Sequence, residues 1–360
     1  MRITKVSVKK LFGIFDHEIP LNQDSRITII HGPNGFGKTI LLTMLNGLFN
    51  SNYRVFRQVS FEEFRVYFDY HEYLMIEKGD DEPGLSFVNV TGTNAAIVLD
   101  ESAGEPVWLK EIKRGINVEL IKTQRLQTEV AIEPDPAQPG ATDSSRNYGL
   151  AVEDVSAKTA RLVHSIRGRP KISEQDLDMF SAVLAELERL ESEYPDAIAE
   201  STDSGLQDVL ERLQDTFKRA SGIHNQSRRL TMLAELLNGH FSFKRVFTDA
   251  ESGLLVFSDN GELIPVASLS SGEQHQLVLF SKLLFDIPQN SLVLIDEPEL
   301  SLHVTWQHEF LNDLKRIIDL CDFDVLLATH SPQIVHDKWD WMVDLHNPEA
   351  DYSDDVAEYA

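Results

Sequence analysis

Cysteine is nearly absent from this sequence, because Cys321 is the only one among 360 residues. Disulfides within the chain and metal sites built from several cysteines are therefore excluded. Cys321 lies in an apolar stretch ahead of an expected strand. A lone thiol in such a place is typical of a small core residue, and we expect Cys321 to be buried.

Long hydrophobic runs are absent as well. No window approaches the roughly 18 uninterrupted apolar residues that a membrane-spanning helix needs. Residues 1–8 alternate polar and apolar side chains as a strand does, and they lack the apolar block of a secretory signal. We therefore expect a chain that makes no membrane contact and stays in the cytoplasm.

Basic side chains are scarce: the chain has 33 lysines and arginines against 58 aspartates and glutamates, and a formal net charge of −25. This charge repels a phosphate backbone on average, so direct nucleic-acid binding would need a local basic patch. Residues 161–171 and 218–229 are the two basic segments, and solvated helix faces are the ordinary alternative for both. Residues 346–360 form an acidic segment that predicts a frayed tail.

Strand patterns dominate the first part of the chain. Polar and apolar residues alternate at residues 6–11, 26–30 and 64–70, which predicts a mixed sheet. Residues 134–147 contain three prolines and a glycine among small polar residues, and they indicate a loop.

Helical periodicity begins at Ser173, where apolar residues recur every three or four positions. This repeat is carried by Leu177, Phe180, Leu184 and Leu187. A second helix is expected over residues 206–217 and a third is expected to end at residue 237, which together give a short helical hairpin with a packing helix. Strand patterns return at residues 241–247 and 253–257, so we expect the chain to re-enter the main sheets there.

A phosphate-binding loop is the first motif that carries chemistry. Residues 32–39 fit the pattern Gly-x-x-x-x-Gly-Lys-Thr between an expected strand and an expected helix. In such a loop the backbone N–H groups point at phosphates, the lysine reaches the β- and γ-phosphates, and the threonine hydroxyl binds Mg²⁺. The expected nucleotide contacts are Asn34, Gly35, Gly37, Lys38 and Thr39.

A pair of acids ends a second apolar run. Residues 292–295 are Leu-Val-Leu-Ile, and Asp296 and Glu297 follow. A buried strand that ends beside the phosphate loop would let Asp296 hold Mg²⁺ and let Glu297 orient and polarise the attacking water. Acids that merely cap a strand end are the structural alternative.

A third motif favours a nucleotide site over acids that merely cap a strand end. Residues 269–274, Leu-Ser-Ser-Gly-Glu-Gln, precede a helical pattern, and with the two motifs above they resemble the signature of ABC ATPases. The resemblance implies that Ser270 and Gly272 touch the γ-phosphate of ATP held by a second copy of the chain. It also implies, from the order of motifs, that Gln124 contacts Mg²⁺ or the attacking water and that His330 senses the γ-phosphate.

The usual form of the signature is Leu-Ser-Gly-Gly-Gln, and Ser271 and Glu273 depart from it. This spelling resembles the SMC-like and OLD-like (overcoming-lysogenisation-defect) branches. Residues 297–303, with Trp306 and Gln307, resemble OLD-like and bacterial anti-phage defence ATPases. One position departs from the SMC-like pattern, since Gly13 stands where many such chains have an arginine near the phosphates.

The resemblance implies an α/β P-loop NTPase of the ABC ATPase head type, with a mixed sheet, an antiparallel subdomain and a helical insertion lobe. The expected division is 1–150 and 240–345 for the head, 151–239 for the insertion and 346–360 for the tail. It implies ATP and Mg²⁺ as cofactors and an ATP-sandwiched homodimer, or a higher oligomer.

The expected role is to regulate or scaffold a separate effector such as a nuclease in anti-phage defence. OLD-like proteins carry a nuclease after the ATPase, whereas this sequence ends soon after Trp341. An SMC-like DNA-repair or DNA-clamp ATPase is the second hypothesis, and a transport nucleotide-binding domain is the third.

Overall fold

The computed structural model describes residues 1–69, 73–78, 85–89, 95–99, 105, 107–122, 144–167, 173–193, 205–249 and 251–346. The chain divides into two units, one made of Met1–Ala151 with Ser270–Ala360 and the other of Val152–Leu269. The first is called the head unit and the second the helical unit. Each is described by itself.

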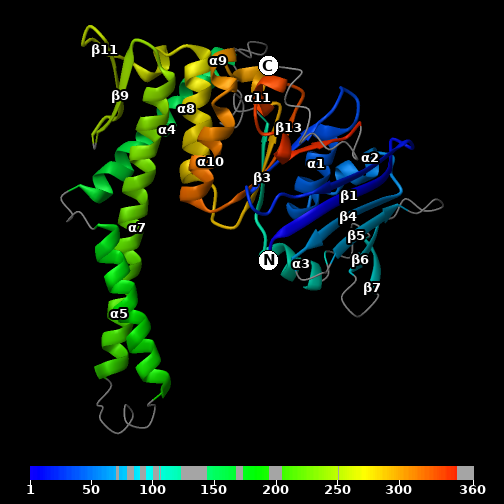
Figure 1. The fold of residues 1–360 in the computed structure, drawn as a ribbon, viewed down its shortest axis with the longest axis horizontal. Helices are drawn as coiled ribbons and strands as arrows, with labels where there is room; N and C mark the ends of the chain where they lie inside the picture. Colours follow the sequence, from blue (N-terminus) through cyan, green and yellow to red (C-terminus); the bar gives the residue numbers. More distant parts are fainter. Residues whose placement is uncertain are drawn as a thin grey trace, which may run out of the picture. The chain divides into compact units, whose positions relative to one another are not determined.

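A five-stranded sheet lies at the centre of the head unit (Figure 1), with the order β14-β3-β13-β12-β8 and only parallel pairs. Its strands are β3 (Ile27–His31), β8 (Val118–Lys122), β12 (Leu292–Asp296), β13 (Asp324–Thr329) and β14 (Met342–Asp344). The continuous apolar runs of β3, β12 and β13 are what a parallel sheet buried on both faces requires. The strand register aligns Asp296 of β12 with Ala328 of β13, and Thr329 of β13 with His31 of β3. The chain segments that follow β12, β13 and β3 therefore leave the sheet at one edge.

A six-stranded antiparallel sheet completes the head unit, with the order β2-β1-β4-β5-β6-β7. Its strands are β1 (Ile3–Leu11), β2 (Phe15–Pro20), β4 (Glu63–Phe68), β5 (Tyr73–Lys78), β6 (Leu85–Asn89) and β7 (Ala95–Leu99). Helix α1 (Lys38–Phe49) shares one hydrophobic core with this sheet and with the parallel sheet: Val6, Leu45 and Leu294 are each 0% exposed. Full burial of such side chains contributes about 1.5–3 kcal/mol each.

Helices cover the rest of the head unit. They are α2 (Arg54–Gln58), α3 (Val107–Arg114), α8 (Ser271–Phe285), α9 (Val304–Gln307), α10 (Phe310–Cys321) and α11 (Pro332–Val335), with short turns η3 (Pro298–Ser301) and η4 (Trp339–Trp341). Cys321 forms no disulfide and is 0% exposed, which confirms its expected place in the core. A parallel and an antiparallel sheet with covering helices, together with the strand–loop–helix motif of β3 and α1, confirm the predicted α/β fold class. The expected single mixed sheet was wrong, because the parallel and antiparallel strands form two separate sheets.

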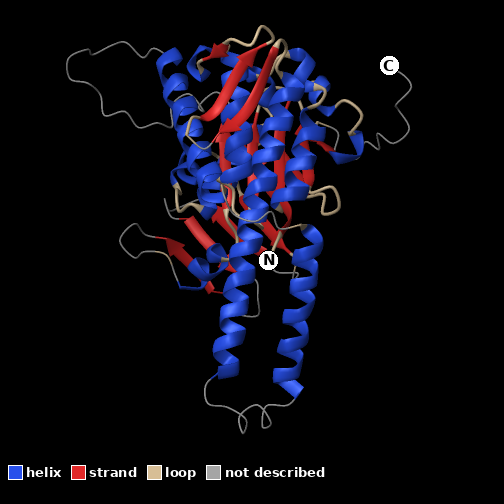
Figure 2. Cartoon of the chain, turned by 90° about the vertical axis from the view of Figure 1, so that its left-hand side faces the viewer, coloured by secondary structure: helices blue, strands red, loops and turns tan. Residues whose placement is uncertain are grey.

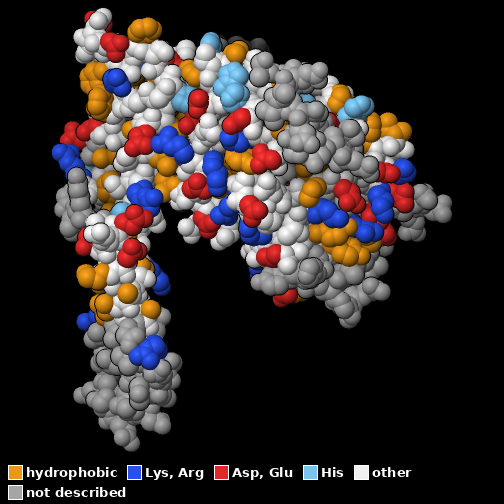
Figure 3. All heavy atoms as spheres, viewed as in Figure 1, with side chains coloured by type: hydrophobic (Ala, Val, Ile, Leu, Met, Phe, Trp, Pro, Cys, Tyr) orange, Lys and Arg blue, Asp and Glu red, His pale blue; other side chains and the backbone are white. Residues whose placement is uncertain are grey.

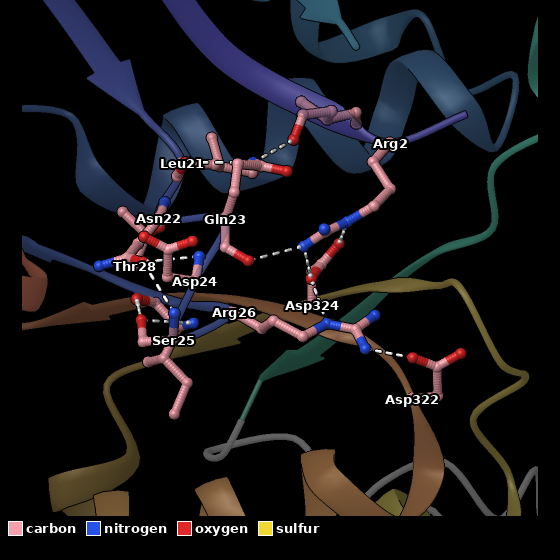
Figure 4. Close-up of polar contacts among 12 residues, drawn as sticks. Arg2, Leu21, Asn22, Gln23, Asp24, Ser25, Arg26, Thr28, Asp322 and Asp324 are labelled. Carbon is pink, nitrogen blue, oxygen red and sulfur yellow. Dashed lines mark hydrogen bonds and ion pairs between the residues drawn. The ribbon is translucent and has the colours of Figure 1, made fainter.

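Two arginines and two aspartates tie the strand beginnings of the head unit together (Figure 4). Asp324, at the start of β13, accepts from Arg2 Nη2 at 2.6 Å and from Arg26 Nε at 2.9 Å, and Arg26 also pairs with Asp322. The Asp324 side chain is 13% exposed. This network lies where β3 and β13 begin, and the loops that follow their last residues, His31 and Thr329, are at the other end of the sheet.

The helical unit contains most of α4 (Ser144–Ile166), α5 (Glu174–Glu193) and α7 (Gly205–His240). Helices α5 and α7 lie side by side (Figures 1 and 2) and run antiparallel, because Glu174 pairs with Arg228 while Phe180 stacks on Phe217 at 5.7 Å. The expected second and third helices are one continuous helix of 36 residues. The prediction of two helices was wrong because Gly222, without any proline nearby, costs a helix only about 1 kcal/mol.

The strand patterns after residue 240 do not rejoin the head sheets. Strands β9 (Lys244–Asp249), β10 (Gly253–Ser258) and β11 (Leu263–Ile264) form their own three-stranded sheet, and η2 (Val266–Ser268) follows. Asn238 of α7 bonds both Val246 N and Val246 O, at 2.8 and 2.9 Å, which occupies the outer edge of β9 at that residue. Ser156 of α4 receives a hydrogen bond from Leu254 N at 3.1 Å. These contacts hold the small sheet to the helices of its own unit.

Some predictions lie outside the described residues: Gln124, residues 134–143 of the predicted loop and the acidic segment beyond His346. The last four residues of the predicted loop, 144–147, belong instead to α4, so the loop prediction was wrong there. Among the described residues, no helix is both long and apolar enough to cross a membrane.

Candidate functional site

The phosphate-binding loop connects β3 to α1. Gly35 and Gly37 have φ of +89° and +86°, a left-handed conformation that favours glycine. A Cβ at Gly37 would lie 2.5 Å from Leu11 Cδ2, whereas one at Gly35 would meet nothing within 4 Å. Helix α1 has neither a side-chain cap nor an acidic residue in its first turn. Its first N–H groups are therefore the kind of donors that bind an anion.

Lys38 lies over the loop that precedes it. Its Nζ donates to Gly32 O at 2.5 Å and to Pro33 O at 3.1 Å, and the residue is 6% exposed. Burial lowers the pKa of the Lys38 amine, against the nearby carboxylates of Glu297, Glu299 and Asp296, which raise it. The ammonium is thus held where a phosphate on the loop would meet it.

Thr39 and Asp296 meet across α1 and β12. Thr39 Oγ1 donates to Asp296 Oδ1 at 3.0 Å. Burial raises the pKa of the Asp296 carboxyl, and the Thr39 hydrogen bond opposes that effect. A hydroxyl and one carboxylate, completed by phosphate oxygens, are a fitting donor set for Mg²⁺, which is usually bound by one or two carboxylates together with substrate phosphates. No group of three or more acidic, histidine or cysteine residues that could hold a metal by itself exists in the described part of the chain.

Glu297 and His330 follow the neighbouring strands β12 and β13. Glu297 N donates to Ala328 O at 2.9 Å, and its φ of +48° turns the chain sharply at the sheet edge. A left-handed residue other than glycine is a local strain that is common at functional sites. His330 Nδ1 lies 3.7 Å from Glu297 Oε1. The structure therefore brings Lys38, Thr39, Asp296, Glu297 and His330 to one edge of the parallel sheet.

Glu299 is a neighbour that the sequence reasoning did not count among the site residues. Its Oε1 lies 3.1 Å from His330 Nδ1 and accepts from His330 N at 3.0 Å, and its side chain is 6% exposed. The available signal was a third acid within four residues of the strand end, in Asp-Glu-Pro-Glu.

Ser270 begins α8 with a capping box. Ser270 Oγ donates to Glu273 Oε2 at 2.8 Å, and Ser270 N donates to the same oxygen at 2.9 Å. A Cβ on Gly272 would lie 3.3 Å from the Trp306 ring, so the close packing of Trp306 favours glycine there. Ser270 is exposed, and its described contacts are within its own helix turn. The contact of Ser270 and Gly272 with ATP in a second copy remains a prediction, as does every role of Gln124.

Aromatic side chains lie at the turn between β1 and β2, where Gly13 stands in place of the arginine of many SMC-like chains. Gly13 has φ of +79° between β1 and β2, and Phe15 packs on Phe36 of the phosphate loop at 4.8 Å between ring centres. His17 Nε2 lies 2.9 Å from Phe36 O, and burial lowers the pKa of its ring. This ring packing and the His17 contact stabilise the phosphate loop at Phe36.

Comparisons with known proteins give one family model and several similar proteins. A family model described as "AAA domain, putative AbiEii toxin, Type IV TA system" matches residues 164–336, which include Ser270, Asp296, Glu297 and His330. Protein ea59 of Escherichia phage lambda is 38% identical over 71 residues, which are 19% of this chain and 13% of that protein. The matched segment thus spans only a small part of that relative.

Solved SMC head structures are also similar. The head domain from Pyrococcus furiosus bound to the C-terminal domain of ScpA has a TM-score of 0.41 at 14% identity, and the head domain from Thermotoga maritima has 0.44 at 12%. A third, an SmcHead bound to the C-winged helix domain of ScpA, has 0.46 at 13%. Each match covers 93% of this chain and 91% of the other. The phosphate loop and the matched AAA family model together support an ATP-binding ATPase.

Proposed function

We propose that this chain is a Mg²⁺-dependent ATPase whose active site is the edge of the parallel sheet. The observation that carries the proposal is the hydrogen bond from Thr39 Oγ1 to Asp296 Oδ1 at 3.0 Å, with Glu297 and His330 following the adjacent strands. A P-loop threonine, a strand-end aspartate and a following glutamate are the parts that phosphoryl transfer to water requires.

Each side chain has a distinct task in this proposal. Backbone N–H groups of Asn34, Gly35 and Gly37 hold the phosphates, and Lys38 neutralises their charge. Thr39 and Asp296, with Gln124, hold Mg²⁺, which when bound supplies charge neutralisation to the phosphate oxygens. Glu297 orients the attacking water and accepts its proton, and His330 contacts the γ-phosphate.

The test of the site uses two substitutions with opposite signatures. Lys38→Ala is expected to abolish ATP binding because the phosphates lose their main positive charge, and calorimetry would measure it. Glu297→Gln is expected to preserve ATP affinity and to slow turnover, since the amide keeps the shape but cannot accept the proton. Undiminished affinity in the first variant, or wild-type turnover in the second, would contradict the assignment.

A homodimer follows from the signature. Ser270 is exposed at the N-terminus of α8, where helix N–H groups and a hydroxyl suit a phosphate. Two heads related by a twofold axis would place Ser270 and Gly272 of one copy on the ATP bound by Lys38 of the other. Mixing Lys38→Ala chains with Ser270→Ala chains rebuilds at most one intact site per mixed dimer, so partial recovery of ATPase activity is expected. Full activity of the Ser270 variant alone would refute the sandwich.

The biological role that we propose is control of a separate effector, such as a nuclease, in anti-phage defence. The matched family description names a toxin of a toxin–antitoxin system, and that match supports a role of this kind. The helical unit offers surface for a partner (Figure 3), because Met179 and Val183 on α5 are 65% and 50% exposed and Phe243 and Phe247 are 81% and 53% exposed.

The effector hypothesis is tested by shortening α5 and α7 together. Deleting residues 173–222 and inserting a short linker removes α5 and the N-terminal half of α7 but keeps the part of α7 that bonds β9. The expected result is unchanged ATP affinity with loss of effector co-purification from a phage-infected host, or of assembly beyond the dimer. A folded deletion variant that still forms the complete complex would show that α5 and the N-terminal half of α7 pack within this chain and do not bind the effector.

Direct nucleic-acid binding, as in an SMC-like clamp, is the second candidate. One observation favours it: Ser165 Oγ of α4 contacts Gln226 Oε1 of α7 at 3.3 Å, so the two basic segments of the sequence lie close together. Arg161 and Arg167 are exposed, and Arg228 is 49% exposed beside Glu174. DNA affinity that falls steeply with salt and weakens in an Arg161→Ala, Arg167→Ala, Arg228→Ala variant would favour this candidate.

A further inference from the structure

Glu299 links the two strand ends that carry the proposed water-orienting base and the phosphate sensor. It lies in η3, two residues after Glu297, and its Oε1 contacts both the backbone N–H and the ring Nδ1 of His330, at 3.0 and 3.1 Å. The peptide N–H donates a hydrogen bond to this carboxylate oxygen, and the ring lies against the same oxygen. A phosphate oxygen only accepts hydrogen bonds, so Nε2 must carry a proton where it contacts the γ-phosphate.

A second pair of bonds holds the same segments together. Ser331 Oγ donates to Gln307 Oε1 at 3.0 Å, and Gln307 Nε2 donates to Leu302 O at 3.2 Å and to Glu299 O at 3.4 Å. Gln307 is 7% exposed. The segment after β12 and the segment after β13 are thus joined on both sides of His330.

The position of Glu299 decides which carboxylate the imidazole contacts. His330 Nδ1 is nearer to Glu299 Oε1, at 3.1 Å, than to Glu297 Oε1, at 3.7 Å. If Glu299 were absent, the ring could turn to Glu297, which would engage the carboxylate that must orient water. Glu299 also keeps one buried oxygen, Oε2, that meets no hydrogen-bond donor in the described part of the chain. Burying a carboxylate oxygen without a hydrogen-bond donor costs free energy, and such a group is characteristic of a functional rather than a packing role.

We propose that Glu299 is a positioning residue that fixes the orientation of His330 and keeps the imidazole away from the base Glu297. This inference rests on the proposed ATP hydrolysis at this site. Glu299 itself touches neither nucleotide nor water in this proposal. It acts through His330, because its Oε1 accepts the peptide N–H and lies 3.1 Å from ring Nδ1.

The experiment compares Glu299→Ala, Glu299→Gln, His330→Ala and the double variant Glu299→Ala/His330→Ala, with the exposed Glu111→Ala as control. Glu299→Ala should lower kcat by on the order of tenfold to a hundredfold with little change in ATP Kd, because a misplaced ring costs the reaction rather than binding. Glu299→Gln should stay within about threefold of wild type, because the amide oxygen still accepts the peptide N–H of His330 and keeps its place beside the ring. In the His330→Ala background, loss of Glu299 should have no further effect.

Three results would overturn the inference while leaving the ATPase intact: wild-type kcat in Glu299→Ala, equal losses in the Ala and Gln variants, or losses that multiply in the double variant. NMR of the His330 ring gives a readout that does not depend on turnover. The ring signals should keep their wild-type positions in Glu299→Gln and should move in Glu299→Ala, where the carboxylate beside the ring is lost. An absence of any wild-type hydrolysis would instead refute the proposed function, and the positioning role would fail with it.

Discussion

His275 should make the head unit sensitive to mild acid. The residue lies in the first turns of α8 with 1% of its surface exposed, and burial lowers the pKa of its ring to about 4, against 6.5 for an ordinary histidine. Between these two values the unfolded chain binds a proton at this position and the folded chain does not. Stability is therefore complete above the ordinary value and falls as the pH drops toward the folded value.

The size of the effect follows from the two pKa values. Between about pH 7.5 and about pH 5.5, the single group removes about 1.4 kcal/mol of unfolding free energy, and the loss approaches roughly 3 kcal/mol well below pH 4. At about pH 5.5 most carboxylates are still ionised, so their protonation contributes little. His17 and His31 shift in the same direction, because burial lowers the pKa of both rings, so the comparison must isolate His275.

The assay is urea unfolding followed by tryptophan fluorescence at the two pH values, in the wild type and in His275→Gln. The variant should lose about 1.4 kcal/mol less than the wild type between them. His308→Gln, at an exposed position of the same unit, is the matched control and should behave as the wild type. An identical pH dependence in His275→Gln and wild type would refute the argument.

Three further substitutions test separate parts of the head unit. Gly37→Ala should abolish ATP binding, and it should lower Tm more than Gly35→Ala does. Both substitutions force an alanine into a left-handed conformation, which costs about 1–2 kcal/mol. Only Gly37→Ala also places a Cβ 2.5 Å from Leu11. Asp324→Asn should cost about 1–3 kcal/mol of unfolding free energy, since two partly buried arginines lose their shared anion, and it should leave ATP affinity unchanged because the network lies at the far end of the strands. Ser270→Ala should cost about 1 kcal/mol through the lost capping box, and Ser270→Thr, which keeps a capping hydroxyl, should restore that stability in the same thermal unfolding measurement.

The head unit was largely predictable because its motifs contain their own local geometry. The run from Ile27 to Thr39 specifies a strand, a glycine turn and a helix start within thirteen residues, and residues 292–297 specify a buried strand with acids at its end. Each pattern depends on backbone conformation or on burial of contiguous residues, which neighbouring residues determine. The parallel register then aligned the strand ends without further information.

The helical unit was less predictable because its strand pairing depends on contacts between residues far apart in the sequence. The strands near residues 244 and 253 were correctly expected, yet nothing in an alternating pattern says which sheet a strand joins. Here Asn238 and Ser156 decide it, through side-chain bonds to Val246 and Leu254. The contact of Glu299 with His330 was not predicted for a similar reason, since it joins residues that are 31 positions apart.

The chain passes between its two units at two places, and one of them bears on the proposed mechanism. The first crossing is within α4, after Ala151, and the second is between Leu269 and Ser270. Ser270 is therefore both the first residue of the returning head and the residue expected to bind the ATP of a second copy. Because its cap bonds fix the start of α8, a phosphate that engages Ser270 must alter those bonds or the backbone beside them. In the proposed function, that change would reach the helical unit through the covalent link at Leu269, and the proposed effector would sense ATP through this link.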